Sequence, residues 1–126
     1  MKKKILVIED ESIIAEDISL ALKKIGCRVI GTFASAEKAL SRLKKDTPDL
    51  VLADIVLNGT LNGIEAAEII MCRYEIPVLF LTSYSDDITI KRIKATKARG
   101  YLIKPVTTNE LKKALEKAFS KNDTSS

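Results

Sequence analysis

Hydrophobic runs and helix-type spacing alternate five times along the 126 residues of this chain. Residues 5–8 form an unbroken apolar run, which is typical of a strand that is covered on both faces of a sheet. From Ser12 to Ile25 apolar residues recur every three or four positions, and Gly26 then favours the end of a helix. The pattern predicts five strands, each followed by a helix.

The other elements follow from the same pattern. We expect strands at 27–33, 50–54, 78–81 and 100–103, and helices after Ser35, from Ile64 to about Tyr74, after Ser85–Asp87, and from Thr108 as an N-cap. No glycine- or serine-rich linker interrupts the series. Parallel strands need crossover connections, so such a series favours a parallel sheet with helices on both faces. We therefore expect one doubly wound α/β domain over residues 1–120 and a flexible polar tail over 121–126.

Polar residues follow four of these strands directly. Glu9 and Asp10 come after the first strand, Asp54 ends the third, Thr82 follows the fourth and Lys104 follows the fifth. In doubly wound sheets the ligand site lies beyond the carboxyl ends of the strands. Carboxylates gathered there repel one another, and their hard oxygens favour Mg²⁺. The pattern indicates a magnesium site suited to phosphoryl transfer onto Asp54, beside Lys104 and Thr82.

Composition narrows the remaining possibilities. The chain has no histidine, which excludes Ser-His catalysis and most zinc sites. Cys27 and Cys72 lack ligand spacing, and we expect both to be reduced, half-buried core residues. The net charge is +4, but the lysines are spread among acids on helix faces, so we expect no direct nucleic-acid binding. With no apolar run of membrane-spanning or signal-peptide length, we expect a cytoplasmic protein that does not bind membranes.

Four segments carry a resemblance to a known family. They are Val7–Glu11, Asp49–Ile55, Phe80–Tyr84 and Gly100–Pro105, in this order along the chain. Through them the chain, from Lys4 to about Phe119, resembles the receiver domains of response regulators. The resemblance implies a flavodoxin-like fold: a five-stranded parallel sheet in the order 2-1-3-4-5 with five helices on both faces.

The resemblance also implies a role for the acidic residues. Asp54 would accept a phosphoryl group from a sensor histidine kinase or a phosphotransfer protein. Mg²⁺ would be held by Glu9, Asp10, Asp54 and the backbone carbonyl of Val56. The domain would not be an enzyme, beyond catalysing its own phosphorylation and dephosphorylation.

The same resemblance implies a conformational switch. Lys104 and Thr82 would bind the phosphoryl group, and Thr82 would move together with Tyr101. The peptide bond between Lys104 and Pro105 would be cis. The switched domain would act on a downstream protein or output domain, with phosphorylation-dependent dimerisation as one route.

The chain departs from the family pattern in one loop, and other functions stay open. After Asp54, residues 55–63 are one longer than usual and lack the usual proline, as in receivers that are attached to or work with sensor kinases. The main alternative is a receiver-like interaction module that works without phosphorylation. A magnesium-dependent phosphatase is less favoured because Val56 stands where its general acid would be. A nucleotide-binding protein is least favoured because no glycine-rich phosphate motif is present.

Overall fold

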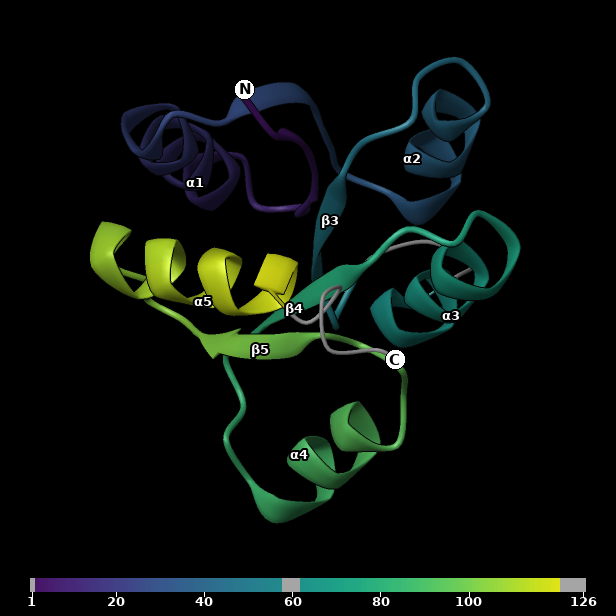
Figure 1. Cartoon of the computed structure of the whole chain (residues 1–126). Coiled ribbons are helices and arrows are strands. Elements are labelled where there is room, and N and C mark those ends of the chain that lie inside the picture. The colour runs from purple at the N-terminus through teal and green to yellow at the C-terminus, as the bar shows by residue number, and fades with distance from the viewer. Residues whose placement is uncertain (1, 58–61, 121–126) are drawn as a thin grey trace.

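Strands and helices alternate throughout the described part of the chain (Figure 1). The computed structural model describes residues 2–57 and 62–120, so the expected tail and loop positions 58–61 lie outside the described residues. The strands are β1 (Lys4–Ile8), β2 (Arg28–Phe33), β3 (Leu50–Asp54), β4 (Val78–Thr82) and β5 (Gly100–Ile103). The helices are α1 (Ser12–Ile25), α2 (Ala36–Leu43), α3 (Gly63–Arg73), α4 (Asp87–Lys94) and α5 (Thr108–Ser120).

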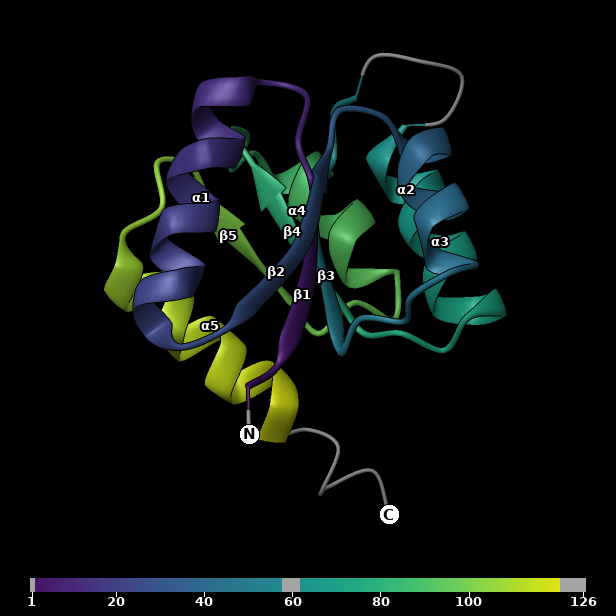
Figure 2. The same cartoon turned by 90° about the horizontal axis from the view of Figure 1, so that it is seen from above.

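The strands form one parallel sheet in the order β2-β1-β3-β4-β5. Figure 2 shows α1 and α5 on one face of this sheet and α2 and α3 on the other. A hydrophobic core lies on each face of the sheet, and alternate residues of β3 point into one core or the other. Leu50 and Leu52 pack with α1 and α5, whereas Val51 and Ala53 pack with the helices on the opposite face. All of β3 is therefore buried, which explains its unbroken apolar sequence. The predicted fold and strand order are confirmed.

Two local predictions are wrong. The N-cap of α5 is Thr107 and not Thr108, because the Thr107 hydroxyl accepts a hydrogen bond from the Glu110 backbone N–H at 3.1 Å. Glu110 in turn accepts one from the Thr107 N–H at 3.0 Å, which completes a capping box. Cys72 is exposed, because it lies off the face of α3 that buries Ile70, whereas Cys27 is half-buried as expected.

The helices of the described residues are short or amphipathic. None of them is long and apolar enough to cross a membrane. Helix α1 ends at Gly26 as predicted. Gly26 itself has a left-handed backbone conformation, with φ of 103°, and its N–H is directed at the carbonyls of Leu22 and Lys23.

Candidate functional site

The carboxyl ends of the strands bring their polar side chains to one edge of the sheet. In the parallel register Ile8 lies beside Ala53, and Asp54 lies beside Leu81. Glu9, which follows β1, and Thr82, the last residue of β4, therefore flank the end of β3. Glu9, Asp54 and Thr82 are 2%, 5% and 0% exposed. Three polar side chains are thus buried where the sequence predicts a site.

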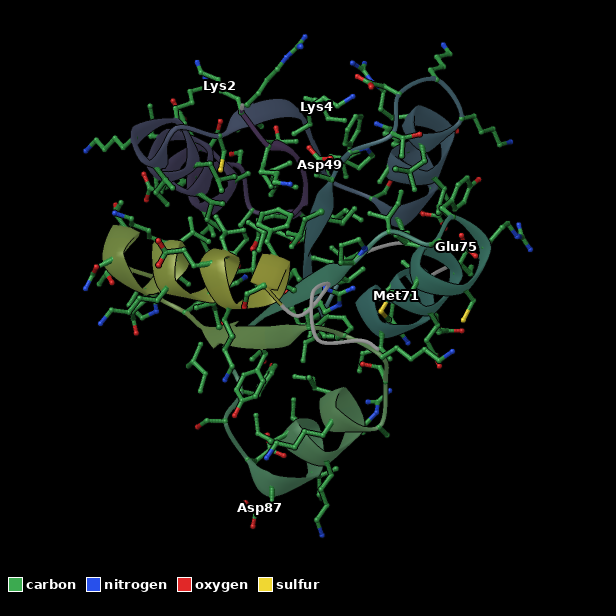
Figure 3. All side chains as sticks on the ribbon, viewed as in Figure 1. Lys2, Lys4, Asp49, Met71, Glu75 and Asp87 are labelled. Atoms are coloured by element: carbon green, nitrogen blue, oxygen red, sulfur yellow. The ribbon has the colours of Figure 1, made fainter. Side chains whose placement is uncertain are left out.

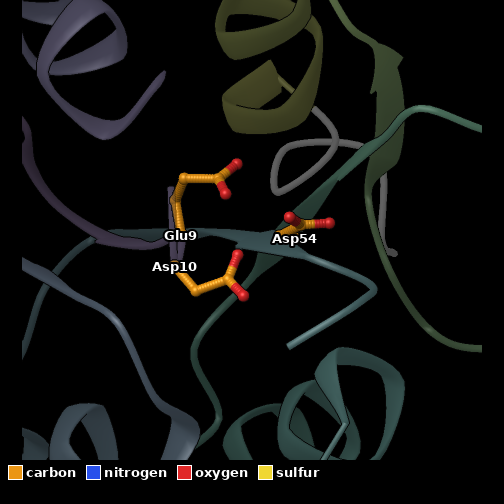
Figure 4. A group of neighbouring side chains, drawn as sticks. All are labelled: Glu9, Asp10 and Asp54. Atoms are coloured by element: carbon orange, nitrogen blue, oxygen red, sulfur yellow. The ribbon is translucent and has the colours of Figure 1, made fainter. Parts of the chain in front are cut away.

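The carboxylates of Glu9, Asp10 and Asp54 form a cluster (Figure 4). Each offers one oxygen, and these oxygens all lie within 4.8 Å of one another. The Val56 N–H donates to Asp54 Oδ1 at 3.1 Å, and the Glu11 N–H donates to Glu9 Oε2 at 3.1 Å. These backbone bonds hold two of the carboxylates in place.

The ammonium of Lys104 links two members of the cluster. Its Nζ is 2.9 Å from Asp54 Oδ2 and also forms an ion pair with Glu9 Oε1. Burial by itself lowers the pKa of Lys104, but the hydrogen bonds and charges of Asp54 and Glu9 outweigh it, so this pKa is raised. Burial raises the pKa of Glu9, more than the hydrogen bond from Lys104 lowers it.

The donor set fits a hard divalent cation. Three carboxylate groups and one ammonium carry a formal net charge of about −2, which one Mg²⁺ would neutralise. The donors within the cluster are oxygens alone, and oxygen is what Mg²⁺ prefers over the softer metals. A pocket of about 170 Å³ lies beside the cluster and leaves space for a small group next to Asp54; its lining includes Asp10, Glu11, Val56, Tyr84 and Lys104.

The two residues expected to form a switch occupy different settings. The hydroxyl of Thr82 accepts a hydrogen bond from the Tyr84 N–H at 2.9 Å and donates one to the Tyr84 carbonyl at 3.1 Å. Tyr101 is half-buried and packs against the core formed with α2, α3 and α4. The Thr82 hydroxyl is therefore bonded to the loop that follows β4.

The peptide bond between Lys104 and Pro105 is cis.

Gly63 is a site-forming residue to which the sequence pattern assigns no role. It is the first residue of α3, and its N–H donates to the Ile55 carbonyl at 3.1 Å. A Cβ at this position would lie 1.8 Å from the carbonyl oxygen of Asp54 and 2.6 Å from Ile55 Cα. Only glycine lets α3 begin directly against the end of β3. The Asn62-Gly63 pair, in which Asn62 caps the helix, is the signal that could have indicated this contact.

A comparison with protein families identifies the domain. The model of the response regulator receiver domain matches residues 5–116. This chain belongs to the response-regulator receiver family. The receiver domain has the strand order of this fold. Its acidic cluster lies at the carboxyl edge of the sheet, where such folds bind ligands.

Curated relatives of the receiver domain are larger proteins. The transcriptional regulatory protein PdtaR of Mycobacterium tuberculosis is 29% identical over 119 residues, which cover 94% of this chain and 58% of PdtaR. The transcriptional regulatory protein YvrH of Bacillus subtilis is 33% identical over 126 residues, which cover 97% of this chain and 53% of YvrH. The chain thus spans little more than half the length of these relatives.

Solved structures agree with the receiver fold over the whole chain. The signal receiver domain of a modulated diguanylate cyclase from Desulfovibrio desulfuricans G20 has a TM-score of 0.91 at 32% identity and covers 100% of both chains. The chemotaxis response regulator CheY4 of Vibrio cholerae has a TM-score of 0.84 at 26% identity, over 94% of this chain and 99% of that one.

Proposed function

We propose that this receiver domain works in the cytoplasm, where it accepts a phosphoryl group on Asp54 from a sensor histidine kinase or a phosphotransfer protein. The phosphorylated domain then changes conformation and controls a partner protein or an output domain. The observation that carries the proposal is the position of Lys104, whose ammonium lies between Asp54 and Glu9 within a cluster of three carboxylates. An ammonium beside a partly buried acceptor carboxylate is the arrangement that phosphoryl transfer needs.

The residues of the cluster divide the chemistry among them. An oxygen of Asp54 forms a bond to phosphorus as the bond from phosphorus to the donor breaks, and the donor retains that electron pair. Lys104 turns from the free carboxylates to the phosphoryl oxygens. Mg²⁺, held by Glu9, Asp10, Asp54 and the Val56 carbonyl, would neutralise charge on those oxygens.

Acetyl phosphate tests the proposal without the kinase. We expect intact-mass spectra to show one added phosphoryl group that depends on Mg²⁺ and is lost in Asp54→Asn. Asp17→Asn is the matched control, because this exposed α1 carboxylate lies outside the acidic cluster, and it should be phosphorylated normally. A folded protein that binds Mg²⁺ but takes up no phosphoryl group would favour the phosphorylation-independent module.

The conformational step is carried by Thr82 and Tyr101. A phosphoryl group on Asp54 draws the Thr82 hydroxyl away from Tyr84, and Tyr101 then moves inward into the space that is vacated. We expect beryllofluoride, a phosphoryl mimic, to shift the NMR signals of the Tyr101 ring in the native domain. In Thr82→Ala the mimic should still bind, but the Tyr101 shift should fall severalfold. A full shift in this variant would contradict the coupling.

A further inference from the structure

Positive charge gathers around a pocket at the end of the sheet opposite Asp54. The pocket, of about 230 Å³, lies where the chain enters β1 and where α1 and α5 end. Figure 2 shows the N-terminal end of the chain beside the last turns of α5. Lys3 and Lys112 line the pocket, and one acid, Glu116, lines it with them. We call this feature the basic pocket.

Further cations lie close in sequence to residues of the basic pocket. Lys23 and Lys24 lie in the last turn of α1, directly before the pocket residues Ile25 and Gly26. Lys2, on the outside of the molecule in Figure 3, adds another charge. All of these side chains are exposed, and none forms an ion pair with another described residue. Among the described residues, the cations in and next to the pocket therefore outnumber its one acid, Glu116.

The floor of the basic pocket is apolar. It is formed by Ile25, Leu115 and Phe119, of which Leu115 is 3% exposed. The Lys3 ammonium lies 4.8 Å from the centre of the Phe119 ring, so one face of that ring is already covered. The pocket can therefore take an apolar group while its rim attracts negative charge.

We infer that the basic pocket binds an acidic peptide segment of a partner protein, with one apolar side chain of the segment seated on its floor. The rim and the floor together require a ligand that carries both carboxylates and an aliphatic anchor. A membrane surface fits less well, because membrane binding needs apolar groups that protrude, whereas Leu115 is buried and Ile25 and Phe119 are half-buried. Nucleic acid fits less well, because Lys3 occupies the ring on which a base would stack.

The basic pocket and the acidic cluster lie at opposite edges of the sheet. Asp54 ends β3 at the carboxyl edge of the sheet, whereas Lys3 precedes β1 at the amino edge. A segment bound in the basic pocket therefore leaves the acidic cluster accessible. The inference holds whether or not Asp54 is phosphorylated.

A labelled acidic peptide of sequence DDELEDD, in which leucine is the anchor, tests the inference by fluorescence anisotropy. We expect the affinity for the full chain to fall at least about tenfold in the triple variant Lys3→Glu, Lys24→Glu, Lys112→Glu. The matched control Lys38→Glu, Lys91→Glu, Lys94→Glu makes the same change of charge on exposed residues of α2 and α4, and it should cost less than about threefold. Glu116→Gln removes the acid of the pocket and should tighten binding about twofold.

Other outcomes would overturn the inference. Equal losses in the two triple variants would show attraction by net charge alone. Unchanged binding after serine replaces the leucine of the peptide would show that the floor plays no part. Tighter binding of single-stranded RNA or of phosphatidylserine vesicles, lost in the same pocket variant, would assign the surface to that partner instead. Self-association of the chain that is lost in the pocket variant would assign the surface to a second copy of the chain. In that copy Asp86, Asp87 and the exposed Ile88 form an acidic segment with an apolar anchor. Thermal melts would confirm that each variant is folded.

Discussion

Replacing Lys104 with methionine should destabilise the metal-free domain by about 3 kcal/mol and slow the phosphorylation of Asp54 at least about 100-fold. The side chains of Lys104, Glu9 and Asp54 are only 9%, 0% and 7% exposed. Methionine keeps most of the volume but removes the charge that both carboxylates share. The loss of stability comes from two buried carboxylates that are left facing each other, and the slower phosphorylation comes from the missing charge beside the phosphoryl oxygens.

Mg²⁺ and pH separate these two effects. Mg²⁺ should restore most of the stability of Lys104→Met, because it supplies positive charge to the same oxygens, but it should not restore the rate. Without the ammonium, the pKa of Glu9 should rise further. A carboxyl whose pKa is raised by folding stabilises the fold below its unfolded pKa and loses that contribution as pH rises through its folded pKa. The destabilisation should therefore be larger at pH 8 than at pH 5.

Urea unfolding with and without Mg²⁺, together with acetyl phosphate kinetics, would measure these changes. Lys97→Met, on an exposed residue away from the acidic cluster, is the control and should alter neither quantity. A variant as stable as the native domain at pH 8 without Mg²⁺ would show that the ion pairs of Lys104 contribute little.

Gly63→Ala should destabilise the domain by about 3 kcal/mol or more. The added Cβ would meet backbone atoms, at 1.8 Å from the Asp54 oxygen and 2.6 Å from Ile55 Cα, and no side-chain rotation can relieve those contacts. Either α3 must move away from β3, or the peptide that follows Asp54 must shift. Both movements disturb the backbone that orients the Asp54 carboxylate, so Mg²⁺ affinity should fall as well.

Gly31→Ala provides the matched control for this prediction. Its Cβ would lie 2.7 Å from the ring of Phe33, a half-buried side chain that can turn, so we expect a loss of about 1 kcal/mol. Urea denaturation of both variants, with Mg²⁺ titrations of the folded forms, measures the difference. Equal free energies of unfolding for the two variants would show that the start of α3 can move away from Asp54 at little cost.

The pattern of apolar and polar residues was sufficient to predict the strands and the edge of the sheet at which the site lies. Strands buried on both faces must be apolar at every position, so the pattern predicts β3 and β4 with almost correct ends. Polar residues at the carboxyl ends of parallel strands must meet at one edge of the sheet, and this rule alone brings Glu9, Asp54 and Thr82 together.

Details that depend on side-chain geometry could not be predicted. Whether Lys104 pairs with one carboxylate or with two depends on its rotamer, and so does the direction of the Thr82 hydroxyl. The tight contact at Gly63 depends on how closely α3 approaches β3, which residue spacing does not reveal. Thr107 and Thr108 are both good N-caps by residue type, and only the two hydrogen bonds between Thr107 and Glu110 distinguish them.

In the switch proposed for Thr82 and Tyr101, the two hydrogen bonds between Thr82 and Tyr84 would favour the resting arrangement. Each contributes about 0.5–1.5 kcal/mol, so together they hold the resting arrangement by about 1–3 kcal/mol. If the two arrangements differed by this energy alone, between roughly 15% and under 1% of unphosphorylated molecules would adopt the active arrangement. On the proposed function, the strength of this loop contact would influence both the activity in the absence of stimulus and the range of response left for the kinase.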